Sequence, residues 1–297
     1  MPGALAGDRA MCETAIMAKD VDDAPAAGSG TFEPSEAAFV LDPACPVLPH
    51  GRRLSAGMAV EPHVHPRGQL LWAMEGVLRV FADGSVWIVP PSHAVWIPGG
   101  VRHHMMTETQ VELRNLYVDP SRPMRLGPDG RPQCSVLLLT PLLRELILRL
   151  DTRAAAKTFD AAFHRLSEVA LDEIDRLAEA PLSLPGGRDQ RLMRLTQYLG
   201  DRPGDAQPLA ALARLVGASP RTLERLFRNE TGLTFRQWRG RNRLLRAVEQ
   251  LHLGRSSTEI AWSLGYSSPS AFIAAFRARF GRTPQAFVRI TQHGAAE

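Results

Sequence analysis

Residues 258–284 read TEIAWSLGYSSPSAFIAAFRARFGRTP, and this stretch decides the fold of the C-terminal third of the chain. Apolar residues recur at helical spacing on both sides of Gly265, which predicts two short helices joined by a tight turn. Ser268 and Pro269 place a cap and a first-turn proline at the start of the second helix, and Gly281 is expected to end it. Two short helices joined by a glycine-containing turn are typical of a helix-turn-helix unit.

The same pattern occurs once earlier in the chain, so the C-terminal third contains an internal repeat. The spacing is 48 residues before the turn and 49 residues after it, which indicates one inserted residue in the second turn. A plain helical bundle needs no small residues or turn glycines at matching places, whereas closely crossing helices need both. The matched pairs are Leu212 and Ile260, Ala213 and Ala261, Gly217 and Gly265, Ser219 and Ser268, Phe227 and Phe276, Gly232 and Gly281, Thr234 and Thr283, and Trp238 and Phe287.

We therefore predict two helix-turn-helix units, at about 208–231 and about 257–280, within a domain of residues 188–290. The segment between them, Thr234 to Leu253, is helical in pattern and would be roughly 30 Å long at 1.5 Å per residue. One turn of B-DNA is roughly 34 Å, so a rigid connector of that length would place both second helices in successive major grooves.

These residues resemble the AraC/XylS family of transcription regulators, over the stretch from residue 189 to residue 289. The resemblance implies that the protein binds double-stranded operator DNA as an activator or a repressor, with RNA polymerase as a further candidate partner. It also implies that Arg221, Glu224 and Arg225 of the first unit read bases, since arginine can pair with guanine and glutamate can accept from cytosine. Arg228 is expected to contact phosphate or to carry a solvated charge.

The second unit departs from the family pattern on its outward face. At the position where many relatives carry a base-reading arginine, this chain has Ala274. We expect apolar contact with thymine methyl groups and phosphate anchoring by Arg277 in place of direct hydrogen-bonded reading. The candidate DNA-contacting residues of this unit are Ser270, Ile273, Ala274 and Arg277.

The charge distribution supports a nucleic-acid partner for this end of the chain. From Gly186 onward there are 18 Arg or Lys and 8 Asp or Glu, a net charge of +10. The first 185 residues carry 17 and 23, a net charge of −6. A basic third joined to an acidic remainder is typical of a polyanion-binding module attached to another domain.

The front of the chain has the pattern of a β domain. Residues 1–30 are rich in Ala, Gly, Asp and Pro without periodicity and are predicted to be disordered. Between 31 and 140, short β-type runs alternate with Gly- or Pro-containing turns, as in an all-β barrel or sandwich. The runs are Leu70–Met74, Val77–Phe81, Val86–Val89, Ala94–Ile97 and Val111–Val118.

Five of the nine histidines lie between His63 and His104. The spacing of His63, His65 and Gln69 is similar to the first motif of cupin barrels, with Gln where metal-binding cupins usually have Glu. The spacing around His103 is similar to the second cupin motif. This resemblance implies that His63, His65 and His103 line one pocket with Gln69 beside them, and a continuous strand would present residues 63, 65 and 69 on one face.

The sequence supports two interpretations of this pocket's chemistry equally well. Two or three imidazoles with one oxygen ligand would suit a divalent transition metal such as Fe, Zn, Ni or Mn. A metal-free pocket for a small organic effector is the alternative, because cupin domains in regulators often keep the fold around such a pocket and Gln is a poorer ligand than Glu. In a third interpretation, the histidines bind no ligand and only stabilise the fold. His50 and His93 carry no signal for either role.

Helical spacing resumes after Thr140 and Pro141, a cap followed by a first-turn proline. Apolar stripes at 142–150 and 163–177 predict a helical dimerisation element at 141–180, because they exceed what a short helical pair needs for contact with its own barrel. Residues 181–187 are the best linker candidate.

The predicted fold class is therefore α+β with two domains: a cupin-like β-barrel at 31–140, then an all-α domain with two helix-turn-helix units joined by a long helix. The predicted function is a homodimeric, sequence-specific transcription regulator whose N-terminal pocket senses a small-molecule effector or a metal. A metal-dependent cupin enzyme carrying a DNA-binding tail is the rival, and the missing carboxylate argues against it, so we predict no enzymatic activity. No signal peptide or membrane-spanning run is visible, and the three cysteines are too few and too scattered for a disulfide framework. We expect a cytoplasmic protein.

Overall fold

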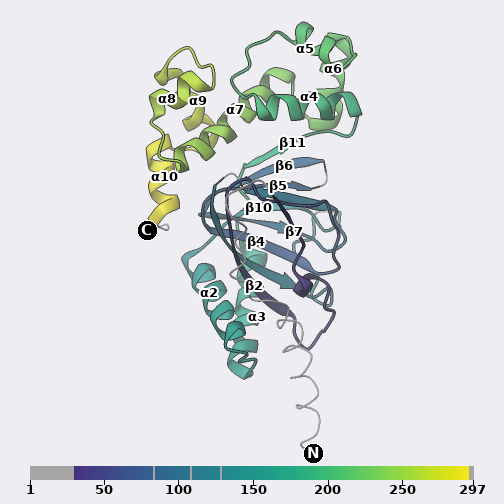
Figure 1. Cartoon of the computed structure of the whole chain (residues 1–297), viewed down its shortest axis with the longest axis vertical. Coiled ribbons are helices and arrows are strands. Elements are labelled where there is room, and N and C mark those ends of the chain that lie inside the picture. The colour runs from purple at the N-terminus through teal and green to yellow at the C-terminus, as the bar shows by residue number, and fades with distance from the viewer. Residues whose placement is uncertain (1–29, 83, 108, 128, 294–297) are drawn as a thin grey trace, which may run out of the picture. The chain divides into compact units, whose positions relative to one another are not determined.

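The computed structural model describes residues 30–82, 84–107, 109–127 and 129–293 (Figure 1). The chain divides into two compact units, of which the first holds the described residues up to 82 and from 89 to 180. The second holds residues 84–88 and 181–293. The first unit is rich in β-strands and the second is mainly helical, which confirms the predicted α+β class. The prediction of disorder for residues 1–30 falls, apart from Gly30, outside the described residues.

The strands of the first unit form two sheets. One has the strand order β10-β7-β4-β9-β2 and is antiparallel throughout. In the other, β1 pairs in parallel with β3, which is followed by β8 and β5 in antiparallel pairing. The bounds are β1 (Thr31–Phe32), a 3-10 turn (Glu36–Ala38), β2 (Val47–Leu54), β3 (Ala59–Val60), β4 (Gly68–Glu75), β5 (Leu78–Ala82), β7 (His93–Ile97), β8 (His103–Thr107), β9 (Val111–Val118) and β10 (Ser135–Leu138).

Strand β4 shows how the sheets create an interior. It lies between β7 and β9, and its residues are buried from Gly68 to Ala73. Leu70 and Trp72 point to one face, where they join the main apolar core. Gln69 and Leu71 are one residue out of phase and line a cavity together with residues of the other sheet. The strand period therefore separates a packing face from a cavity-lining one.

Two helices, α2 (Pro141–Ala155) and α3 (Ala161–Arg176), complete the first unit and lie beside β2 in Figure 1. The Thr140 hydroxyl accepts a hydrogen bond from the backbone N–H of Leu143, so the predicted cap is confirmed. Most residues of both apolar stripes belong to the same buried core as the Leu70 and Trp72 face of the sheet. The sheet therefore accounts for most of both stripes, whereas Leu142 and Val169 stay exposed. Dimerisation itself stays a prediction.

The second unit contains the repeated helix pairs. The helices are α4 (Gln190–Asp201), α5 (Leu209–Leu215), α6 (Pro220–Leu226) with a π-helical turn η2 (Phe227–Thr231), α7 (Phe235–His252), α8 (Ser257–Ser263), α9 (Pro269–Phe280) and α10 (Pro284–His293). The Ser268 hydroxyl accepts from the backbone N–H of Ala271, which confirms the predicted cap of α9. Gly281 ends α9 at a φ of 73°, a left-handed conformation that glycine adopts without steric cost. The long connector is the single helix α7.

The segment predicted as a linker has structure of its own. Residues Ser183–Pro185 form β11, which pairs antiparallel with β6 (Ser85–Val89). The Trp238 indole N–H donates to the carbonyl of Pro185 at 2.7 Å. The Glu230 carboxylate accepts from the backbone N–H groups of Arg188 and Asp189, at the start of α4. The sequence alone missed this because the partners lie some 40 to 100 residues away.

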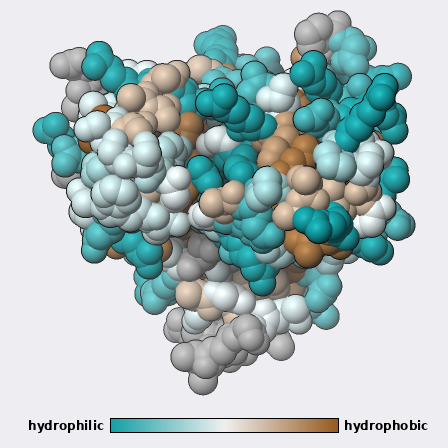
Figure 2. Space-filling view, turned by 90° about the horizontal axis from the view of Figure 1, so that it is seen from above, coloured by the Kyte–Doolittle hydropathy of each residue, from teal (hydrophilic) through white to brown (hydrophobic). Residues whose placement is uncertain are grey.

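The surface is mostly hydrophilic in the face that Figure 2 presents, with small hydrophobic areas between. Exposed large apolar side chains such as Leu215 and Trp262 are scattered over several elements, as is usual for folded proteins. Within the described part of the chain, no helix combines the length and the apolar character that crossing a bilayer requires.

Candidate functional site

The structure brings His63, His65 and His103 together. His63 and His103 exchange backbone hydrogen bonds at 3.0 Å in both directions, an antiparallel bridge that holds the two segments side by side. The ring centroids of His63 and His103 are 4.3 Å apart, and those of His65 and His103 are 4.8 Å apart. The expected continuous strand is absent, because the chain bends at Pro66 and Arg67 before β4 begins.

Each of the three imidazoles has its Nδ1 committed to a backbone carbonyl. The Nδ1–H groups of His63, His65 and His103 donate, each at 2.8 Å, to carbonyl oxygens two residues away in the chain. Burial lowers the pKa of all three rings, and it lowers the pKa of His103 to about 4. Neutral rings that donate through Nδ1 leave Nε2 as a bare lone pair, the form that binds a metal.

The candidate ligand atoms of the three rings all lie within 4.8 Å of one another. The Nε2 of His103 is buried and has no hydrogen-bond partner among the described residues. The Nε2 of His65 lies 3.2 Å from the Oε1 of Gln69, so two acceptor atoms face each other. A cation between them, or an amide flip that turns the Gln69 NH2 toward His65, removes this conflict. The donor set therefore fits a divalent transition metal, as three imidazoles and one oxygen.

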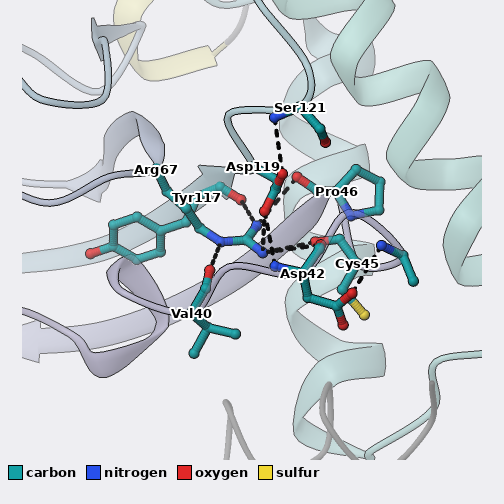
Figure 3. Close-up of polar contacts among 9 residues, drawn as sticks. Val40, Asp42, Cys45, Pro46, Arg67, Tyr117, Asp119 and Ser121 are labelled. Atoms are coloured by element: carbon teal, nitrogen blue, oxygen red, sulfur yellow. Dashed lines mark hydrogen bonds and ion pairs between the residues drawn. The ribbon is translucent and has the colours of Figure 1, made fainter. Parts of the chain in front are cut away.

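Arg67 holds the bend between His65 and Gln69 in place. Its side chain is fully buried and forms an ion pair with Asp119 at 3.3 Å. Its own carbonyl is the acceptor for His65 Nδ1. Figure 3 shows the guanidinium surrounded by acceptors from two distant segments, namely the carbonyls of Val40, Asp42, Cys45, Pro46 and Tyr117. The ligand-bearing bend is thus tied to the segment before β2 and to the end of β9.

Asp119 is prepared for this pair by further hydrogen bonds. Its carboxylate accepts from the backbone N–H groups of Asp42 and Ser121, each at 3.0 Å. Burial raises the pKa of Asp119, but the Ser121 and Asp42 donors and the Arg67 charge outweigh it and leave the pKa below its usual value. The carboxylate is therefore ionised and balances the buried guanidinium.

A cavity of about 30 Å³ lies beside the histidines. It is roughly the size needed for one or two water molecules, and well below the 300–1,000 Å³ of a typical small-molecule site. As it stands, the cavity suits an ion or a small polar group. Its lining residues are Phe32, Pro34, Ser35, His50, Arg52, Val60, His63, Gln69, Leu71, His103, Met105, Leu113, Asn115 and Tyr117.

In the first helix-turn-helix unit, α6 presents one charged face. Arg221, Glu224 and Arg225 are exposed, whereas Leu223 and Leu226 on the opposite side are buried. The exposed Arg228 follows in the π-helical turn, which has no counterpart in α9. The helical period thus places all four predicted contact residues where a DNA groove could reach them.

In the second helix-turn-helix unit, α9 presents a face with few polar groups. Ser270, Ala274 and Arg277 are exposed and Ile273 is half-buried. These four residues line a shallow hollow together with Ala278, Gly281 and Thr283. The two units therefore share a backbone plan and differ in the chemistry that they present.

Two family models match the chain. The AraC-like ligand binding domain matches residues 52–183, and the helix-turn-helix domain matches residues 212–290. The HTH-type transcriptional regulator NimR of Escherichia coli K12 is 34% identical over 226 residues, which cover 76% of this chain and 81% of NimR. The chain belongs to the AraC family of transcriptional regulators.

The chain is also similar to one further curated regulator and to one solved structure. The HTH-type transcriptional activator RhaS of Escherichia fergusonii is 32% identical over 146 residues, 48% of this chain and 52% of RhaS. The solved structure of ToxT from Vibrio cholerae with a bound unsaturated fatty acid is 10% identical, covers 84% of this chain and 97% of ToxT, and has a TM-score of 0.37. As an AraC-family member, the protein is a DNA-binding transcriptional regulator with an N-terminal ligand-binding domain.

Five residues of this regulator's N-terminal site were missed from the sequence. Arg67 lay inside the quoted histidine motif, so an arginine between two candidate ligands was an available signal. Arg52, Asn115 and Tyr117 gave none, because they reach the cavity through the pairing of β2 and β4 with β9. His50, to which the sequence assigned no role, also lines the cavity.

Proposed function

We propose that this regulator reads its operator mainly through α6 and uses α9 mainly as an anchor. The observation that carries this proposal is the exposed row of Arg221, Glu224 and Arg225, which has no counterpart on α9. Arginine and glutamate can discriminate bases by hydrogen bonds, whereas Ala274 and Ile273 can contact only thymine methyl groups. The 18-residue connector α7 is about 27 Å long at 1.5 Å per residue, compatible with successive major grooves roughly 34 Å apart.

The test is quantitative footprinting of the full-length protein on a selected site and on a scrambled site. Arg225→Ala should weaken specific binding by roughly 1–3 kcal/mol and relax the preference at one base pair. Arg194→Ala is the matched control, because it removes an exposed arginine of α4, which lies in the same compact unit but outside the two helix-turn-helix units. Equal losses on both sites would demote Arg225 to a phosphate contact.

We propose that His63, His65, His103 and Gln69 hold a divalent transition metal, which supplies a cationic anchor for the effector. Three features support this: the bare Nε2 atoms, the acceptor–acceptor contact of His65 and Gln69, and the size of the cavity. The chain's own residues orient the rings through the carbonyls of Glu61, Arg67 and Val101. Phe32 of β1, with Pro34 and Ser35 before the 3-10 turn, helps to enclose the site.

Elemental analysis of protein purified without a histidine tag tests the metal. Combined replacement of His63 and His103 by Ala should abolish both metal binding and the response to effector, with basal DNA binding retained in the other unit. A metal content equal to that of the double variant would overturn the metal proposal. Normal induction in the double variant would overturn the assignment of the effector site.

A sensing role is proposed over catalysis because the donor set lacks the carboxylate of metal-binding cupins, and no Asp or Glu is among the described residues that line the cavity. We also propose a cytoplasmic homodimer, for which the exposed Leu142 of α2 and Val169 of α3 are available contacts. Light scattering at micromolar protein concentration tests the dimer, and a monomeric mass would contradict the proposal. Contact with RNA polymerase stays a prediction.

A further inference from the structure

The proposed metal site has an unbalanced charge. Its four donors, three imidazoles and the amide oxygen of Gln69, are all neutral. A divalent cation bound there would keep its full charge of +2. In a buried site such a charge is costly unless an opposite charge accompanies it. With an amide at position 69 the site lacks the negative charge that a carboxylate at the same position would supply.

A second positive charge faces the same cavity. Arg52 of β2 lines it, with its guanidinium 5.0 Å from the centre of the Phe32 ring and donating to the carbonyl of Glu33 at 3.3 Å. Burial raises the pKa of Tyr117, while the Asn115 and Ser35 hydrogen bonds and the Arg52 charge oppose that rise. Among the described lining residues there is no acidic side chain to neutralise it.

The Tyr117 hydroxyl lines the same cavity. It accepts from the amide groups of Gln69 at 3.4 Å and Asn115 at 3.5 Å, which leaves its own hydrogen for an acceptor. The Ser35 side chain is a hydrogen-bonding neighbour of this hydroxyl, and a ligand oxygen in the cavity would compete with it for that hydrogen. A ligand that brings negative charge and an acceptor oxygen would balance both positive charges and accept the hydrogen of the Tyr117 hydroxyl.

We propose that the effector of this regulator is a small organic anion of the carboxylate class, bound between the metal and Arg52 and receiving a hydrogen bond from Tyr117. The inference rests on the proposed metal site, because the metal supplies most of the attraction. Gln69 then determines specificity: its neutral amide leaves the countercharge to the effector. The cavity admits only a small group unless the enclosing segment around Phe32 and Pro34 shifts.

The test uses full-length protein loaded with Co²⁺, whose visible spectrum reports changes in its ligands. Acetate and its neutral isostere acetamide are titrated separately. Acetate should change the Co²⁺ spectrum with saturation, and acetamide should not at the same concentrations. Arg52→Gln should weaken acetate binding by about tenfold. Its Co²⁺ affinity should not fall, because removing a nearby positive charge favours a cation. Arg53→Gln is the matched control, since this neighbouring side chain is 68% exposed and pairs with Glu112.

Gln69→Glu supplies the reverse test. An internal carboxylate should tighten Co²⁺ binding and weaken acetate binding, because the site then carries its own countercharge. Tyr117→Phe removes only the hydroxyl and should weaken acetate severalfold, which keeps the proposal testable if Arg52→Gln does not fold.

The outcomes separate the two proposals. If the wild-type protein and the histidine double variant give the same Co²⁺ spectrum, the proposed metal site is wrong. Co²⁺ binding with equal responses to acetate and acetamide, or acetate binding unchanged by both Arg52→Gln and Tyr117→Phe, overturns the anion inference alone.

Discussion

Replacing Arg67 by Met should destabilise the N-terminal unit more than any surface charge substitution. The methionine keeps much of the side-chain volume and removes the guanidinium. The ion pair with Asp119 joins side chains that are 0% and 3% exposed, so the aspartate would be left buried and uncompensated. Breaking a buried pair from one side costs about 3–5 kcal/mol.

The lost hydrogen bonds place this variant at the upper end of that range. The guanidinium donates to the carbonyls of Val40 and Cys45, before β2, and of Tyr117 in β9. Hydrogen bonds from a charged donor contribute about 1.5–3 kcal/mol each, although they do not add when they share one side chain. We expect a loss of about 4–5 kcal/mol, a large part of the roughly 5–15 kcal/mol that stabilises a domain.

Urea unfolding of the full-length protein, followed by hydrogen exchange of peptides from residues 40–54 and 212–226, measures this loss in each unit separately. Arg53→Met is the control, since exposed pairs contribute about 1 kcal/mol or less. Adding Asp119→Asn to Arg67→Met should recover part of the stability, because it removes the buried unpaired charge. A loss below about 1 kcal/mol for Arg67→Met, or one equal to the control, would refute the reasoning.

Three further predictions concern the other sites. Arg221→Ala should reduce specific DNA binding far more than Ser270→Ala does in a binding-site selection, and equal effects would contradict the assignment of base reading to α6. In metal-free protein, His103 has a pKa of about 4 against 6.5 when unfolded, so the unfolded chain binds the extra proton as pH falls between these values. His103 alone should therefore lower the free energy of unfolding by roughly 2 kcal/mol between pH 7.5 and 5. His103→Gln should show a drop smaller by that amount, with the remainder due to His63 and His65, whose pKa values burial also lowers; an equal drop in parent and variant would count against the buried neutral ring. Ser268→Ala removes the cap of α9 and should cost about 1 kcal/mol of stability, measured by thermal unfolding. Ser270→Ala is the control, because it removes a serine hydroxyl of α9 that is not the cap.

Local sequence patterns were sufficient to predict the helix pairs of the C-terminal unit. Helix starts and ends depend on groups within one turn of each other, as in the bond from the Ala271 N–H to the Ser268 hydroxyl or the left-handed Gly281. Helical periodicity also decided which residues of α6 face outward, because residues three and four apart share a face. The internal repeat added a second copy of the same local evidence, which is why the family could be recognised from these residues.

Tertiary structure decided the N-terminal site. The approach of His103 to His63 depends on which strands pair, and Gln69 meets Tyr117 across 48 residues of chain. Strand pairing and register are non-local, so no local pattern could place Arg52, Asn115 or Tyr117 in the cavity.

The apolar stripes of α2 and α3 make the same point in the opposite direction. Helical spacing predicted the stripes correctly, and it could not say whether a sheet of the same chain or a second protomer would cover them. The sheet covers most of both stripes because its face with Leu70 and Trp72 is equally apolar and lies in the same molecule, and it leaves Leu142 and Val169 exposed. The burial of Arg67 follows from the same cause, since its acceptors come from segments that only the folded chain brings around it.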